Sequence, residues 1–491
     1  MKTSKLILGI VLLTGICFPS LAQQQSTMYF MSIPQNHLLN PALKIPSKVY
    51  VGIPFLTGVS GNFHTNFIGL SDIFNKTGDG EMISILNPDF DKDAFLAKVK
   101  EVNYITPGVT IQSLGFGFTV GNDLQFYLDI NEKVDGKLAL PYDLFNLAFN
   151  GAEELIGKTV DLTETDVDMI LYREIGVGFS KNIIPRLRVG ARAKIIMGMA
   201  AANLETRDLR VEVLDDNTQR MTSDFTVNIS APVTVIKDGE GKIEDVEFND
   251  DQLSKPGYYF NTDNLGFGLD IGAVYSLTQR ITLSAALNGF GFINWNRDIT
   301  NITAQNEFTY TGFDLNAVIE GTAEIEDVTR DLIDSLENSF VITDVADPFK
   351  SVLPGTLTLG GAYSLTESIS FGVVSSTLFV SGKPRTSLML SANANLAKGF
   401  CAGLSYTATN RSFNNLGLGL AARLGPVQIY TIADKIPFNF SRVGSEEEDS
   451  GKVLLPDKWN ALSVRLGMNL VFGSNPKKKS DKPMVLTTVE M

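Results

Sequence analysis

Histidine and cysteine, the side chains that most often carry catalysis or bind metals, are scarce in this chain. The sequence holds two of each, namely His37, His64, Cys17 and Cys401. The two histidines lack the spacing of metal ligands, and no Gly-x-Ser-x-Gly motif supplies a nucleophile that they could activate. No phosphate-binding loop or dinucleotide motif is present either. The sequence therefore predicts that the protein is not an enzyme and binds neither a metal nor a cofactor.

Charged residues form a second set of candidate functional side chains, and they alternate with apolar residues along the chain. In the stretch 187–195, two arginines and a lysine are interleaved with leucine, valine, alanine and isoleucine. Successive side chains of a β-strand point to opposite faces, and a charge facing lipid would cost about 2–4 kcal/mol at mid-membrane. We therefore expect seven charged side chains to face the lumen of a barrel: Glu174, Arg188, Arg192, Lys194, Asp270, Arg423 and Arg465. Their mixed signs favour salt bridges within the wall over the alternative, a conduction or ligand site.

These charges belong to a two-residue pattern that recurs along the chain. From Leu114 to Val120, large apolar residues alternate with small or polar ones. About ten residues of such alternation are typical of one crossing of a transmembrane β-barrel. The pattern predicts an all-β fold, a transmembrane antiparallel β-barrel of about 14 strands over residues 48–473, with a periplasmic tail at 474–491. The expected strands are 49–64, 111–121, 124–130, 171–180, 186–197, 265–276, 280–290, 356–364, 368–377, 386–396, 400–409, 414–424, 427–433 and 459–472.

The connections between the expected strands alternate in length. Those at 122–123 and 425–426 are short, whereas those at 131–170, 198–264 and 291–355 are long. Bacterial barrels have short periplasmic turns and longer outside loops, so we expect both termini in the periplasm. Apolar residues at helical spacing also predict helices within the long loops, at 89–102, 142–156 and 325–336.

The N-terminus has the features of a secretory signal peptide. Lys2 and Lys5 precede an apolar run from Leu6 to Phe18, and small residues before Gln23 suit cleavage at that point. We expect residues 1–22 to be removed. Lipoprotein processing at Cys17 is the alternative, but it would require a small residue where Ile16 stands. No later run of about eighteen apolar residues predicts a membrane helix, and the combination indicates a bacterial outer membrane.

An apolar segment precedes the first expected strand. Residues 29–43 are too apolar to extend into water, and Asn-Pro favours a turn, so we expect residues 23–47 to form a plug inside the barrel. The motif in this plug is Asn40, Pro41, Ala42 and Leu43. In its position before a fourteen-stranded barrel, it resembles the N-terminal hatch of the long-chain fatty-acid transporter family. It equally resembles barrel proteins associated with type IX secretion, and a group of uncharacterised outer-membrane proteins that carry Asn-Pro-Ala after a similar leader.

Two function classes follow from these observations. The first is transport of a small, hydrophobic molecule through a plugged lumen, as the resemblance implies, although inward arginines and a lysine are unfavourable for a wholly apolar tunnel. The alternative is a non-transporting scaffold or secretion-accessory protein that binds envelope proteins by its loops. Outer-membrane lipid is an expected partner in both cases, whereas the formal net charge of −14 argues against nucleic acid. An apolar pocket behind the plug would favour transport, and a fully packed lumen would favour a scaffold.

Overall fold

The computed structural model describes residues 27–76, 82–85, 87, 89–121, 123–214, 218–237, 243–253, 255–260, 262–311, 346–380, 383–397, 399–409, 412–436, 440–443, 453–456 and 460–474. The predicted signal peptide, the predicted helix at 325–336 and all but the first residue of the predicted tail lie outside these ranges. No helix in the described part of the chain is long and apolar enough to cross a membrane.

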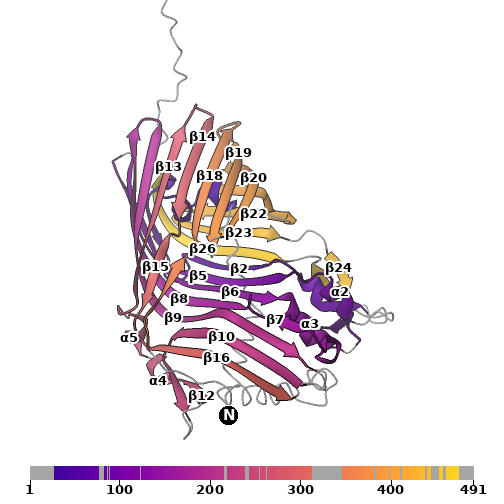
Figure 1. The fold of residues 1–491 in the computed structure, drawn as a ribbon. Helices are drawn as coiled ribbons and strands as arrows, with labels where there is room; N and C mark the ends of the chain where they lie inside the picture. The colour runs from indigo at the N-terminus through magenta and orange to yellow at the C-terminus, as the bar shows by residue number, and fades with distance from the viewer. Residues whose placement is uncertain are drawn as a thin grey trace, which may run out of the picture.

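The described chain forms a closed antiparallel β-barrel of 14 wall strands (Figure 1). The first wall strand has two parts, β1 and β2, which both pair with β5 and with β26, and this pairing closes the barrel. Each predicted strand falls on one wall strand, so the predicted fold class is confirmed. The wall strands are β1 (Ser47–Gly52) with β2 (Gly58–Thr65), β5 (Val102–Val120), β6 (Leu124–Pro141), β8 (Asp166–Ile184), β9 (Leu187–Val213), β13 (Leu265–Ser276), β14 (Ile281–Asn288), β18 (Gly355–Ser364), β19 (Ile369–Val380), β20 (Lys383–Ala397), β21 (Phe400–Thr409), β22 (Ser412–Leu424), β23 (Val427–Ile436) and β26 (Ala461–Ser474).

Several wall strands continue well past the residues that show the two-residue pattern. β9 is 27 residues long, and its second half pairs with β7 (Thr159–Asp161) and β10 (Thr218–Ser230). β10 in turn pairs with β16 (Ile299–Thr311), while β15 (Gly291–Trp295) and β17 (Phe349–Leu353) pair beyond β14 and β18. Much of the stretch expected to be loop is therefore sheet. Apolar side chains of these strands pack in clusters of their own, one around Ile293 and Trp295 of β15 and another around Val211 and Val213 of β9.

The long connections also carry helices and hairpins. Figure 1 shows α2 (Lys92–Leu96), α3 (Tyr142–Asn150) and β24 (Phe440–Val443) on the right, and α4 (Asp250–Leu253), α5 (Pro256–Tyr259) and β12 (Ile243–Phe248) at the lower left. Phe95 and Leu96 of α2 pack with Phe145 and Phe149 of α3, so these loops have a small apolar core of their own. Helices are thus present in two of the predicted loop stretches. The elements are η3 (Leu70–Ile73), β3 (Phe74–Lys76), β4 (Met82–Ser84), α2 (Lys92–Leu96), α3 (Tyr142–Asn150), η4 (Glu153–Leu155), β11 (Val233–Lys237), β12 (Ile243–Phe248), α4 (Asp250–Leu253), α5 (Pro256–Tyr259), β24 (Phe440–Val443) and β25 (Val453–Pro456).

The two faces of the wall differ sharply in polarity. Val177 and Leu466 are 59% and 53% exposed on the outer face, whereas Glu174 and Asn469 of the same strands are 2% and 0% exposed. An outer surface covered with large apolar side chains is stable in hydrocarbon, and a closed barrel leaves no backbone group unpaired there. The wall is therefore that of a transmembrane β-barrel of the outer-membrane type.

Candidate functional site

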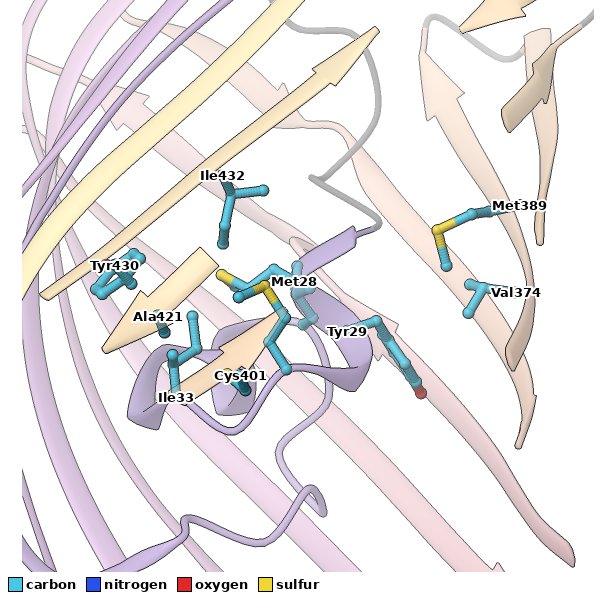
Figure 2. Close-up of a cluster of buried hydrophobic side chains, with 11 residues drawn as sticks. Met28, Tyr29, Ile33, Val374, Met389, Cys401, Ala421, Tyr430 and Ile432 are labelled. Carbon is cyan, nitrogen blue, oxygen red and sulfur yellow. The ribbon is translucent and has the colours of Figure 1, made fainter. Parts of the chain in front are cut away.

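The N-terminal segment, residues 27–46, fills part of the lumen. Its apolar residues come from η1 (Thr27–Phe30), η2 (Pro34–Leu38) and the turns around them. Figure 2 shows Met28 and Ile33 close to Cys401 and Ala421 of the wall. Burial of such side chains is the main force that holds the segment inside the barrel. The cluster contains Met28, Tyr29, Met31, Ile33 and Leu39 from the segment and Val374, Met389, Cys401, Ala421, Tyr430 and Ile432 from β19–β23.

Hydrogen bonds tie the same segment to the wall along its length. The amides of Gln35 and Asn469 bond to each other twice, at 2.7 and 3.0 Å. Near the end of the segment, the Gln125 amide accepts from the Ile45 N–H at 3.1 Å and donates to the Ile45 carbonyl at 3.0 Å. Thr27 at its start donates to the Asp434 carboxylate. The segment is therefore held at both ends, and we call residues 27–46 the plug.

The predicted motif, Asn40 to Leu43, forms a turn against the wall. The Asn40 side-chain oxygen accepts from the Ala42 N–H at 2.9 Å, and the Asn40 carbonyl accepts from the Leu43 N–H at 2.9 Å. The Tyr127 hydroxyl donates to the Pro41 carbonyl at 3.3 Å. Wall glycines make this approach possible, because a Cβ on Gly190 would meet the Pro41 backbone and a Cβ on Gly272 would meet the Asn40 amide.

A buried network of charges lies beside the plug on the opposite side of the lumen. Arg192 of β9 is 3% exposed and contacts three carboxylates, those of Asp129, Glu174 at 2.5 Å and Asp270 at 2.7 Å. Lys194 pairs with Asp270 at 2.6 Å, and Lys133 pairs with Glu174 at 3.1 Å. Three cations thus face three carboxylates, so each buried charge is compensated.

The network unites four of the seven charged residues that sequence parity assigns to the lumen, namely Glu174, Arg192, Lys194 and Asp270. Asp129 and Lys133 complete the network. They are absent from the residues predicted from the sequence, although both stand at lumen-facing positions of β6. The plug reaches the network through His37, whose Nε2 lies 3.6 Å from Asp129 Oδ2. The His37 ring also lies 4.3 Å from the Tyr127 ring, measured between centroids.

The other three predicted residues lie apart from this network. Arg188 donates to Gln125, at 2.7 Å, and to the Ser180 hydroxyl, at 2.7 Å. Arg423 donates to backbone carbonyls of Gly425 and Val471 beside a short turn. Arg465 donates to the Ser60 hydroxyl at 3.3 Å and lines a cavity on the long-loop side of the plug. Each of these three arginines therefore has its own hydrogen-bond partners, and none of them pairs with a carboxylate of the network.

Two cavities contact the plug from opposite sides. The larger, about 160 Å³, lies toward the long loops and is lined by Met28 and Leu39 of the plug together with Arg192, Lys194 and Arg465 of the wall. The smaller, about 140 Å³, lies toward the short turns and is lined by Ser32 and Pro46 of the plug and by the wall around Arg423. Within the described residues, no group of histidine, cysteine and carboxylate side chains is arranged to hold a metal ion.

Fold and lumen together define a transmembrane β-barrel whose interior holds a plug and a charged cavity. The chain belongs to a family described as "Family of unknown function (DUF5723)", whose model matches residues 41–434. No curated protein matches it in sequence.

Solved structures similar to this chain are barrels. They include the toluene transporter TbuX of Ralstonia pickettii, with 10% identity, 89% of this chain and 94% of that chain covered, and a TM-score of 0.40. A FadL homologue of Pseudomonas aeruginosa has 11% identity, 93% and 99% coverage, and a TM-score of 0.40. The translocator domain of the autotransporter NalP from Neisseria meningitidis has 7% identity, 89% and 92% coverage, and a TM-score of 0.32. These likenesses concern architecture and specify no cargo, and none of them supports the resemblance to type IX secretion barrels.

Proposed function

We propose that this protein is an outer-membrane channel that its own N-terminal plug keeps closed, and that a small molecule passes when the plug moves. The observation that carries the proposal is the position of the plug between two cavities, one on each side. A scaffold has no need of space inside its lumen, whereas a gated channel needs a compartment on either side of its gate.

The chemistry of the larger cavity favours a polar cargo over a hydrocarbon. Arg192, Lys194, Glu174, Asp270 and Arg465 all line it. An apolar molecule entering this space would displace water from charged groups without replacing the lost hydrogen bonds. The hydrophobic cargo expected from the sequence resemblance is therefore not part of the proposal.

The proposed orientation places both termini in the periplasm. The short connections, such as those at 185–186 and 425–426, lie at the same end of the barrel as the smaller cavity. Periplasmic turns of such barrels are short. An epitope inserted after Gly157, in a long loop, should be labelled on intact cells, while one inserted at Gly425 should not. The reverse labelling pattern would contradict the orientation.

Deletion of the plug tests the channel directly. Removing residues 27–44 should leave a folded barrel, because the wall strands hydrogen bond to each other and not through the plug. Folding can be verified by the shift in electrophoretic mobility between heated and unheated samples. In a planar lipid bilayer, the deletion should conduct ions more strongly and more steadily than the parent chain.

A double variant serves as the graded control. Asn40→Ala with Pro41→Ala removes the turn's side-chain bonds but keeps the apolar contacts of the plug, so its conductance should lie between parent and deletion. Near-zero conductance from a folded deletion would contradict the channel and would favour the scaffold that binds envelope proteins.

A further inference from the structure

Arg465 differs from the other cations of the larger cavity. Lys133, Arg192 and Lys194 each pair with a carboxylate. Arg465 donates to the Ser60 hydroxyl at 3.3 Å and lies against the Tyr430 hydroxyl, and no carboxylate of the described residues pairs with it. Arg465 is therefore the lining cation that is left to pair with an anionic ligand, and a guanidinium can bind a carboxylate through two parallel hydrogen bonds.

The rest of the cavity lining limits the charge and polarity of that ligand. Four cations, namely Lys133, Arg192, Lys194 and Arg465, and three carboxylates, namely Asp135, Glu174 and Asp270, line the cavity, so its lining matches a ligand with a single negative charge. Hydroxyl and amide side chains supply many hydrogen-bonding groups, and one of them, the Asn131 amide oxygen, is buried and unpartnered. These polar lining residues are Ser60, Asn62, Thr110, Asn131, Asn288 and Thr356.

We propose that the larger cavity binds a small polyhydroxylated monocarboxylate, a molecule of the sugar-acid class, with Arg465 paired to its carboxylate. The hydroxyl groups of the ligand bond to the hydroxyl and amide side chains that line the cavity. This inference rests on the proposed channel function, because it names the class of cargo that waits above the plug.

The test uses gluconate and sorbitol, which differ only in that sorbitol has a hydroxymethyl group in place of the carboxylate. Binding to the purified full-length barrel in detergent is measured by saturation-transfer NMR. Gluconate should bind saturably, and sorbitol at least tenfold more weakly. Arg465→Gln should weaken gluconate binding at least tenfold without changing that of sorbitol, and Arg465→Lys should recover part of the loss because it restores the charge.

Arg173→Gln is the matched control, because Arg173 pairs with Glu132 at 2.8 Å away from the cavity and its loss should leave gluconate binding unchanged. All variants must first show the mobility shift of a folded barrel. Equal affinity for gluconate and sorbitol, no saturable binding of gluconate, or full binding by Arg465→Gln would each overturn the proposal. The plug stays in place in these measurements, so a negative result leaves the conductance test of the channel unaffected.

Discussion

The plug meets two different walls inside one barrel. On the side of β19–β23 it packs against apolar side chains such as Met389 and Ile432. On the side of β6–β13 it meets Tyr127, Asp129 and the charges bound to Arg192. Apolar burial is non-directional, whereas a network of charges requires fixed geometry. The apolar wall therefore supplies the energy that retains the plug, and the charged wall fixes the position of the plug.

The largest effect is expected from the charged wall. Arg192→Met should destabilise the whole barrel by about 3–5 kcal/mol, because Asp129, Glu174 and Asp270 would lose their shared cation while still buried. The measurement is the urea concentration at the unfolding midpoint in detergent. Arg173→Met is the matched control, since the Arg173–Glu132 pair is partly exposed and should contribute about 1 kcal/mol or less. Equal unfolding midpoints for Arg192→Met and Arg173→Met would contradict the large contribution that we expect from the buried network of the charged wall.

A smaller effect is expected from the apolar wall, and it should be local to the plug. Ile33→Ala should weaken plug packing by about 2–5 kcal/mol, because Ile33 is fully buried against the wall. Cys401 is buried in the same cluster and is the sole thiol in a chain without Cys17, so its maleimide labelling rate reports plug release. Labelling should become at least tenfold faster. Leu404→Ala, on the exposed face of the same strand, should leave the rate unchanged.

The smallest effect is expected where the wall and the plug turn touch. Gly272→Ala places a methyl group against Asn40 and should cost about 1–3 kcal/mol in crowding. The expected result is more frequent channel openings in a planar bilayer with an unchanged barrel. Gly361→Ala is the control, because the nearest atom to its new methyl is Val373 Cγ1 at an ordinary 3.4 Å. The same opening frequency in both variants would show that the turn does not hold the plug.

Much of the wall could be predicted from the sequence because lipid imposes a simple rule on it. A strand that crosses hydrocarbon must alternate apolar and tolerant positions, so Val177 and Glu174 are distinguishable by parity alone. The rule fails outside the membrane. There the second half of β9 packs Val211 and Val213 against Val160 of β7, and its pairing with β10 joins segments that no lipid-facing pattern marks.

Local sequence patterns are therefore enough to predict the barrel, its strand number and the inward direction of charges such as Arg192 and Asp270, because each strand obeys the polarity of its own surroundings. Which of these charges contact each other depends on the assembled wall. Arg192 contacts Asp129 from a strand more than fifty residues away, while Arg465 faces the same cavity without a carboxylate partner among the described residues. Arg192 and Asp129 stand on strands that have β8 between them, so their contact depends on the register of two strand pairs, which the periodicity of a single strand does not specify.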